Sequence, residues 1–508
     1  MSHRTHTAHT GVNLTPFLRI VLALAVLLPA AACNQPTGQP VQATSTPTGT
    51  LAARVTASPT PAGATRPTAV PTSVRSTPLP TPSLDIQPSA LRGVRVQFWH
   101  PWAGEAGRTL ESRVAEFNRG NSWGITASVT GYQGLGALED AVNAAFLAEN
   151  PPNLLAAYTY QAIGWDVGRT TLVDLQAYTS DPQWGLAETD VADFYPAFWD
   201  ADLVTLPGEQ ADVVKRLGVP LHRLAVVIFY NRTWAEELGF SNPPVSSTGL
   251  RIQACAAARS NNTDVDKDNN NTGGWLLTPQ PGVLTGWVQA FGGQVSRADG
   301  QGYQLDTPPA QQALEFIKGL QEDGCAWRPG TDDPAAAFAS RRALFYAAST
   351  SDLPALTQAF TQASSTDEWI AIPFPSEAGT PAVVAYGPSL SVVHTTSVAD
   401  LAAWELLKWL VTPASQAQWA QAGNYLPARA AARTYLSTSA AASEPWVSAL
   451  NLLPYASPEP TYPSWPVVRR LLVDALQVFY DPLLKAEGLP DFLSDLDALV
   501  ADVHNQVR

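Results

Sequence analysis

Residues 218–231, GVPLHRLAVVIFYN, indicate the fold class of this chain. Within this stretch, six consecutive apolar residues run from Ala225 to Tyr230. A strand with one solvent-facing side alternates apolar and polar residues, so an unbroken run predicts a strand buried on both faces. Such a strand needs other elements packed on either side of it, which is typical of α/β proteins.

The segment before this strand predicts a parallel unit. Apolar and polar residues alternate over 94–98, which predicts a strand, and residues 99–104 are expected to form the loop that follows. Helical spacing of apolar residues over 110–120 and a second strand over 125–129 complete a strand–helix–strand order. Further helices are predicted over 307–324, 397–411 and 466–503.

Charge and length limit the partners and the number of lobes. The chain carries 30 Lys and Arg against 44 Asp and Glu, and its first 90 residues hold five Arg and one acid. The remaining residues therefore have a net charge of −18, which argues against charge-driven binding of nucleic acid or anionic lipid. Those residues number about 418, more than one hydrophobic core usually supports, so two lobes are predicted.

Residues 1–32 have the pattern of a secretory signal. A basic start, an apolar run over 20–28 and small residues before Cys33 favour this interpretation, because the run is too short to span a membrane. A cysteine at this place resembles a bacterial lipoprotein cleavage site, although Ala30 stands where that pattern usually has leucine. The resemblance implies lipid on Cys33 and anchoring to the outer face of the cell membrane, in the periplasm or at the cell surface. The alternative is a plain signal peptide cut near Ala32.

Residues 33–90 are predicted to form a disordered tether. They are rich in Thr, Pro, Ser and Ala and have almost no aromatic or charged residues, so they cannot bury enough apolar surface to fold. A random coil of this length averages about 40 Å end to end, and a polyproline helix reaches about 180 Å.

Cysteine and tryptophan usage add two expectations. Cys255 and Cys325 are the cysteines that follow Cys33, and in an exported protein such a pair suggests a disulfide, with two buried thiols as the alternative. All 16 tryptophans lie beyond residue 98, where they can fill cores or stack on sugar rings.

Short motifs in a fixed order resemble a known family over about residues 93–505. The motifs are 98–102 (FWHPW), 218–221 (GVPL), 229–231 (FYN), 243–244 (PP), 337–343 (AFASRRA), 404–410 (WELLKWL) and 423–429 (GNYLPAR). Together they resemble the family 1 extracellular solute-binding proteins of ABC importers, the maltose-binding-like group. Two departures stand out: Ser340 replaces a glycine of the family, and 247–250 lacks its usual TWdE motif.

The resemblance implies an α/β fold with two lobes, the type II periplasmic-binding-protein-like arrangement, over residues 91–508. Lobe one would hold about 91–223 and 385–425, and lobe two about 226–382 and 428–508. Crossing strands would join the lobes, and a hinge motion would close them on a ligand.

Nine residues are expected to contact that ligand. They are Trp99, Trp102, Tyr158, Tyr160, Trp275, Tyr346, Ser349, Tyr386 and Trp465. The first two follow a strand's carboxyl end, where open α/β sheets bind ligands, although they could instead plug the space beneath the loop. Tyr346 and Ser349 are expected just after a strand over 342–345. Trp275 fits the core as well as it fits the site.

Motifs for metal binding and catalysis are incomplete or absent in the sequence. Acidic residues alternate over 264–270, but a calcium loop of the EF-hand type also needs Gly and Glu where Asn269 and Trp275 stand, so a solvated loop is predicted. The chain has no G-x-S-x-G, H-E-x-x-H or P-loop motif, and neither a metal, a cofactor nor a catalytic residue is predicted. A carboxylate pair for glycoside cleavage has no sequence spacing by which to recognise it.

The sequence therefore predicts a monomeric, lipid-anchored binding protein that passes a sugar or oligosaccharide to the permease subunits of an ABC importer and carries out no chemistry. An exported carbohydrate-active enzyme and a sensory binding protein that signals to a receptor are the alternatives. The ligand could also be a polyol, a glycerol-phosphate or a peptide.

Overall fold

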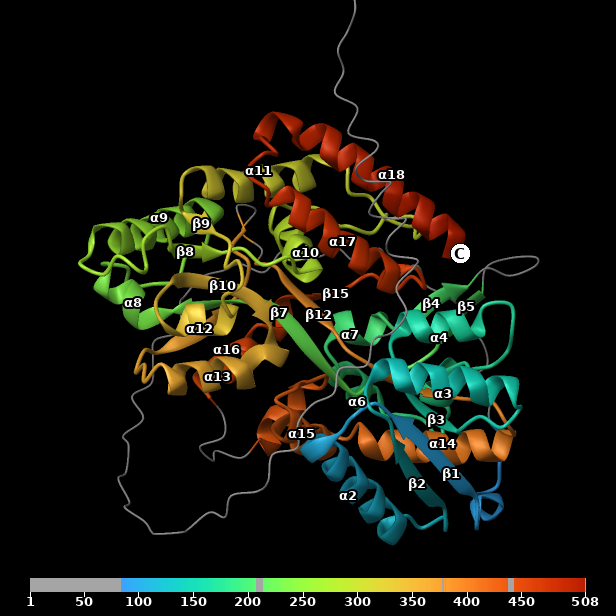
Figure 1. Ribbon diagram of the computed structural model, residues 1–508. Coiled ribbons are helices and arrows are strands. Elements are labelled where there is room, and N and C mark those ends of the chain that lie inside the picture. The colour runs from blue at the N-terminus through green and yellow to red at the C-terminus, as the bar shows by residue number, and fades with distance from the viewer. Residues whose placement is uncertain (1–83, 207–212, 377–378, 380, 437–442, 508) are drawn as a thin grey trace, which may run out of the picture. The chain divides into compact units, whose positions relative to one another are not determined.

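Two β-sheets, each with its own helices, define two lobes in the computed structural model (Figure 1). The described residues are 84–206, 213–376, 379, 381–436 and 443–507. The predicted signal peptide, Cys33 and nearly all of the predicted tether lie outside them. Mixed α/β architecture with two lobes is confirmed. Among the described residues, no helix combines the length and apolar character that crossing a membrane requires.

Lobe one is built on a five-stranded sheet in the order β2-β1-β3-β13-β6. Its strands are β1 (Arg95–His100), β2 (Thr126–Gly131), β3 (Leu154–Ala157), β6 (Val219–Pro220) and β13 (Ser389–Val392), and a hairpin of β4 (Leu203–Leu206) and β5 (Val213–Arg216) lies apart from the sheet. Its helices are α2 (Gly104–Gly120), α3 (Leu135–Leu147), α4 (Thr159–Asp166), α5 (Leu175–Ser180), α6 (Glu188–Asp193), α7 (Pro196–Asp200), α14 (Ser397–Leu410) and α15 (Pro413–Gly423). Figure 1 shows the orange helix α14 beside the blue strand β1, although the two are far apart in sequence.

The predicted parallel unit at the start of the fold is confirmed, with one correction. β1 pairs in parallel with β2 and is followed by α2, as expected. The residues expected to form a loop over 99–104 instead begin within the strand, because Trp99 and His100 still pair with Thr130 and Gly131. The connection to α2 is therefore only three residues long.

Lobe two is built on a sheet in the order β15-β12-β7-β10-β8-β9, with β11 and β14 also paired to β7. Its strands are β7 (His222–Asn231), β8 (Gly273–Leu276), β9 (Ala326–Trp327), β10 (Ala343–Ser349), β11 (Trp369–Ile372), β12 (Val383–Tyr386), β14 (Leu426–Pro427) and β15 (Ala456–Pro458). Its helices are α8 (Arg232–Glu237), α9 (Ser247–Thr263), α10 (Pro281–Ala290), α11 (Pro308–Glu322), α12 (Pro334–Ala339), α13 (Leu353–Gln362), α16 (Glu444–Asn451), α17 (Trp465–Phe479) and α18 (Leu489–Val507). The short 3-10 turns are η1 (Pro88–Leu91), η2 (Thr350–Asp352), η3 (Ala430–Tyr435), η4 (Leu453–Tyr455) and η5 (Ala486–Gly488).

Strand β7 contains the apolar run that opened the sequence analysis, and both of its faces are buried. Residues 225, 227 and 229 pack into one hydrophobic cluster, whereas 226, 228 and 230 pack into another. Because side chains alternate along a strand, burial on both faces requires every residue of the run to be apolar. The predicted doubly buried strand is confirmed, and Figure 1 shows it in green between β10 and β12.

Two neighbouring segments, one leading into β7 and one leaving β12, carry the chain between the lobes. The first leaves the lobe-one sheet at β6, which pairs with β13, and enters the lobe-two sheet at Leu224, which pairs with Tyr386 of β12. The second returns from β12 to β13 through Gly387 and Pro388. A third passage leads from α15 of lobe one to β14, which pairs with the start of β7.

Helix α11 illustrates how local sequence sets an element's start. The Thr307 hydroxyl accepts a hydrogen bond from the Ala310 amide at 3.4 Å, and Pro308 and Pro309 occupy the first positions of the helix. Proline suits these positions because the first amides of a helix have no partner within it. The helix predicted over 307–324 is thereby confirmed.

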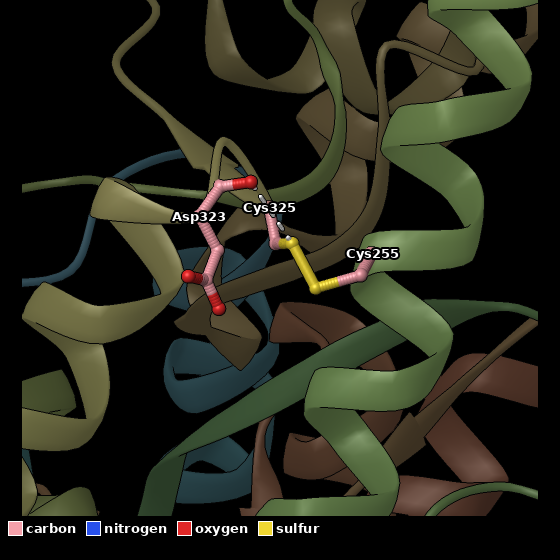
Figure 2. Close-up of side chains that lie close together, drawn as sticks. All are labelled: Cys255, Asp323 and Cys325. Atoms are coloured by element: carbon pink, nitrogen blue, oxygen red, sulfur yellow. Dashed lines mark hydrogen bonds between the residues drawn. A yellow bond between two sulfur atoms is a disulfide. The ribbon is translucent and has the colours of Figure 1, made fainter.

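The predicted disulfide between Cys255 and Cys325 is confirmed (Figure 2). It joins α9 to the residue before β9 across a sequence separation of 70. Asp323 lies beside the bridge, and these three residues are the one group of potential metal ligands found among the described residues. Because a metal is bound by thiolates and these sulfurs are bonded to each other, the bridged form does not offer a thiolate site.

Replacement of both bridged cysteines by alanine should lower the free energy of unfolding by about 4 kcal/mol, since the chain-entropy model assigns that value to a loop of this length. Denaturant unfolding of the double variant and of the wild type, each followed by tryptophan fluorescence, measures the difference. Equal midpoints with equal slopes would contradict a stabilising role for the bridge.

Candidate ligand site between the lobes

Aromatic side chains follow the carboxyl ends of three neighbouring strands of the lobe-one sheet. Trp99 lies near the end of β1, Tyr132 follows β2 and Tyr158 follows β3. The rings of Trp99 and Tyr132 pack with centroids 5.2 Å apart. This edge of an open α/β sheet is where ligands bind, because several strand ends and the loops after them converge there.

Tyr158 and Tyr160 form a stacked pair at the start of α4, with ring centroids 5.3 Å apart. The backbone amide of Tyr158 donates to the Gln161 side chain at 3.0 Å, and that side chain in turn donates to Glu139 of α3 at 2.9 Å. Burial, followed by the nearby Glu139, raises the pKa of Tyr160 to about 12, so its phenol stays protonated at neutral pH. Both rings are half-buried and were predicted to contact ligand.

Lobe two contributes polar and aromatic groups to the same region. The hydroxyls of Ser349 and Tyr386 lie 2.6 Å apart, and the Arg469 guanidinium lies 5.6 Å from the Tyr386 ring centroid. Burial, and then the neighbouring phenol of Tyr386, raise the pKa of Tyr158. Tyr160 also packs against the lobe-two hydrophobic cluster.

Glu459, just after β15, is the carboxylate of this region. Its Oε2 accepts hydrogen bonds from Trp465 Nε1 and from Arg469 Nη1, both at 3.1 Å. Its Oε1 is buried and has no hydrogen-bond partner among the described residues. Burial raises the pKa of Glu459, with Arg469 and Trp465 opposing that rise. An unpaired carboxylate oxygen out of water is costly, so the site suits a hydrogen-bond donor at this point.

We refer to six residues from both lobes as the inter-lobe cluster. They are Tyr158, Tyr160, Ser349, Tyr386, Glu459 and Arg469. Flat aromatic faces, phenol and serine hydroxyls, one carboxylate and one guanidinium are groups that stack on and hydrogen-bond to a polyhydroxyl molecule.

Tyr346 lies behind this cluster, connected to it by hydrogen bonds. It is 4 % exposed and bonds to the side chains of Asp352 and Gln280. The Ser351 hydroxyl lies 3.2 Å from Asp352 Oδ1 and 2.9 Å from Ser349 Oγ, so its one proton can be donated to either, and the Ser351 amide donates to Ser349 Oγ at 3.0 Å. Tyr346 and Ser349 were expected to follow a strand over 342–345, but β10 extends through both, because its ladder with β7 continues to Ser349.

Trp102 and Trp275 lie in aromatic packing, away from the inter-lobe cluster. Trp102 packs with His222 and Trp419 at centroid distances of 5.5 Å and 4.7 Å, which matches the alternative of a plug beneath the loop. Trp275 is 2 % exposed and packs on Trp287 at 5.4 Å.

Trp465 is placed at the first position of α17, as predicted, but its ring is 1 % exposed. It reaches the cluster only through its hydrogen bond to Glu459.

A cavity of about 980 Å³ lies next to the cluster, with walls from both lobes. Lobe one lines it with parts of α4, α7 and β4, and lobe two with parts of α10, 292–296, 298–301, Ser376, 381–382, parts of 455–464 and the end of α18. Of the described lining residues, Glu459 belongs to the cluster and none belongs to the nine predicted contacts. The charged lining residues are Asp200, Asp299 and Glu459, and no lysine or arginine is among those described.

Sequence reasoning missed Glu459 and Arg469. Arg469 follows Trp465 by four residues, so the helix predicted at 466–503 placed the two side chains one turn apart, which is a usable signal. Glu459 stands between two prolines, in a segment with neither helical nor strand periodicity. Its role depends on contacts with residues far along the chain, which no local pattern reports.

Comparison with known proteins gives the same fold. The chain matches the family described as bacterial extracellular solute-binding protein over residues 112–449. No curated protein matches it. Among solved structures, the cyclic alpha-maltosyl-1,6-maltose binding protein from Arthrobacter globiformis superposes with a TM-score of 0.66 at 17 % identity, covering 81 % of this chain and 99 % of that one.

Two further structures extend the likeness. The sugar-binding protein MalE from Xanthomonas citri has a TM-score of 0.65 at 18 % identity, covering 81 % of this chain and 98 % of that one. UgpB from Mycobacterium tuberculosis, solved with glycerophosphocholine, has a TM-score of 0.61 at 16 % identity, covering 81 % and 99 %. With the family match spanning well over half of its residues, the chain belongs to the bacterial extracellular solute-binding proteins.

Proposed function

We propose that this protein binds a sugar or oligosaccharide at the inter-lobe cluster and delivers it to the permease of an ABC importer. The observation that carries the proposal is Glu459, an unpaired buried carboxylate oxygen set among half-buried tyrosines of both lobes. The sugars that the similar structures are described as binding support the sugar assignment. The closed state would be favoured by contacts that the ligand makes to both lobes at once.

Within this proposal, the residues take different roles. Tyr158, Tyr160 and Tyr386 would stack on or hydrogen-bond to the ligand, and Glu459 would accept from a ligand hydroxyl. Trp99 would add a further aromatic side chain on the lobe-one side of the site. Ser349 would contribute through Tyr386, and Tyr346, Trp465, Trp102 and Trp275 would act as packing behind the site.

The cavity favours a neutral ligand over an anionic one. Its described charged lining residues are Asp200, Asp299 and Glu459, and the arginines nearest to the wall, Arg297 and Arg469, are paired with Asp299 and Glu459, so an anion would meet no unpaired cation in the described wall. A polyol or neutral sugar therefore fits better than a free phosphate ester. We further propose that the protein performs no chemistry on the ligand and acts as a monomer.

The lobe limits and the membrane anchor are also part of the proposal. The strand exchange near 221–224 and 387–388 supports limits for lobe one of about 91–223 and 385–425, and for lobe two of about 226–382 and 428–508. The predicted end of the tether at residue 90 needs one correction, because the Leu84 amide donates to Asp181 at 2.8 Å and Pro88–Leu91 form η1. Lipid on Cys33 and a tether that ends before Leu84 would hold the two lobes at the outer face of the cell membrane.

A thermal-shift screen tests the ligand class. A sugar at about 100 times its dissociation constant should stabilise the protein by about 2.7 kcal/mol, because it binds the folded state alone. Mono- and oligosaccharides, polyols, glycerol-phosphates and peptides form the panel, and chromatography of the incubated sugars checks for turnover. A shift only with peptides or phosphates would contradict the sugar assignment, and released product would indicate an enzyme.

Replacing Glu459 with glutamine should weaken binding of the sugar identified in that screen by about tenfold or more, because hydrogen bonds to charged groups contribute roughly 1.5–3 kcal/mol. Isothermal titration calorimetry measures the change. Glu405→Gln is the matched control, since Glu405 is 3 % exposed, pairs with Lys408 on α14 and also has a pKa raised by burial. Equal losses in both variants would argue against a ligand contact at Glu459.

The same variant gives a pH test with a defined sign. Burial raises the pKa of Glu459, and the titratable and charged groups around it are Arg469, Tyr158, Tyr160 and Tyr386. Affinity should fall as the pH drops through this raised pKa, because the protonated acid accepts less well, while the ligand-free protein is stabilised over the same window. The Glu459→Gln variant should lose both trends relative to the wild type.

A Cys33→Ser variant tests the anchor. Without the thiol there is no site for the lipid, so the protein should move from the membrane pellet to the soluble fraction of cells that express it. The wild type should incorporate labelled fatty acid, and the variant should not. Soluble wild-type protein cut near Ala32 would instead establish the plain signal peptide.

A further inference from the structure

We propose that Arg223 and Asp202 act as a positioning pair. The pair links the two crossing segments to each other and fixes the position of Tyr158 and Tyr160, the lobe-one side of the ligand site. The inference rests on the proposed ligand site for its effect on binding. The effect of the pair on the relative motion of the lobes does not depend on a ligand.

Arg223 lies where the chain passes from lobe one to lobe two, and its guanidinium bonds to both crossing segments. Nη1 donates to the carbonyl oxygen of His222 at 2.9 Å and to that of Pro388 at 3.0 Å. Nη2 donates to the Ser389 hydroxyl at 3.2 Å. His222 belongs to the outgoing segment, whereas Pro388 and Ser389 belong to the returning one, so one cation cross-links the two.

Asp202 extends this link into lobe one. Its Oδ2 accepts from the Ser389 hydroxyl at 2.5 Å and lies 3.8 Å from Arg223 Nη2. Its Oδ1 accepts from the Thr159 hydroxyl at 2.8 Å. Thr159 is the first residue of α4 and lies in sequence between Tyr158 and Tyr160, whose rings stack on each other. A series of hydrogen bonds therefore connects the crossing segments to the residue between Tyr158 and Tyr160.

The backbone around this pair leaves little room for adjustment. Gly387 has φ +151°, and a Cβ there would lie 2.8 Å from the His222 carbonyl oxygen. A Cβ on Gly218 would lie 2.9 Å from that of Ser389. Glycine is needed where backbones approach this closely, so the two segments are in direct contact beneath the arginine.

The pair is buried, so its hydrogen bonds are strong, and removing one partner should change how freely the crossing segments bend. Arg223 is 4 % exposed and Asp202 1 % exposed. Charge-assisted hydrogen bonds in such surroundings are little screened by water or salt. Opening and closing of two lobes bends the segments that join them, so a cation bonded to both segments limits the range of that bending.

The distance between the lobes tests this directly. Spin labels on Leu147→Cys in lobe one and Val245→Cys in lobe two, both highly exposed sites, report the distribution by double electron–electron resonance. A Cys33→Ser background leaves no other free thiol when Cys255 and Cys325 are bridged. Arg223→Met should broaden the ligand-free distribution, and Ser389→Ala, which leaves no buried charge unpaired, should broaden it less.

Arg113→Met is the matched control. Arg113 is 7 % exposed and bonds to Glu116 and Ser415, but it lies on α2, within lobe one. Its loss should lower the melting temperature and leave the distance distribution unchanged. A wild-type distribution in both Arg223→Met and Ser389→Ala would overturn the proposal, and so would equal broadening in the control.

Stopped-flow tryptophan fluorescence with maltotriose supplies the second arm. Dissociation from Arg223→Met should be about tenfold faster than from the wild type, within the usual 5–150-fold range of coupling between sites. The control variant should release the sugar at the wild-type rate. If the wild type binds no sugar, the proposed function fails, while the label distances still decide whether the pair restrains the lobes. Broadened distances with unchanged dissociation would overturn the link to the ligand site.

Discussion

Strand β7 imposes the constraint on which the rest of the structure depends. Its side chains alternate between two hydrophobic clusters, and its edges pair with β10, β11, β12 and β14. Burial on both faces removes every residue of the run from water, which is a large favourable term. It also requires other elements of the chain to pack on each face of the strand. Helices α10 and α16 pack on β7, and their buried residues belong to the two different clusters, so they cover opposite faces of the strand.

The inter-lobe cluster is a product of this arrangement. β12, which pairs along β7, ends at Tyr386, and β10, on the other side of β7, ends at Ser349, so two strand ends bring the two hydroxyls together. Glu459 and Arg469 come from the segment that follows β15, which itself pairs with β12. Tyr158 and Tyr160 meet them from the carboxyl edge of the other sheet. Neither lobe alone holds all of the groups that would surround a ligand.

Much of the fold could be predicted from sequence because its signals are local. Apolar periodicity located β7, α11 and α14, and the family motifs implied the two lobes. Strand ends were harder to place, since Trp99 and Ser349 are kept in their strands by ladder partners far away in sequence. The candidate site was recovered in part: the tyrosines were found by their positions after strands. Glu459 could not be found, because the role of this isolated carboxylate between prolines depends on its contacts with Trp465 and Arg469 in the folded structure.

The strand order of lobe one also has a consequence for biosynthesis. β13 lies between β3 and β6 in the sheet, yet more than 200 residues separate its residues 389–392 from those of β3. At ordinary rates of synthesis the ribosome needs roughly 10–50 s to make that stretch. Throughout this interval the edge of β3 that pairs with β13 has no partner, so lobe one cannot complete its sheet until residues 389–392 have been made. The sheet of lobe one is therefore completed only after strands β7 to β12 of lobe two have been synthesised.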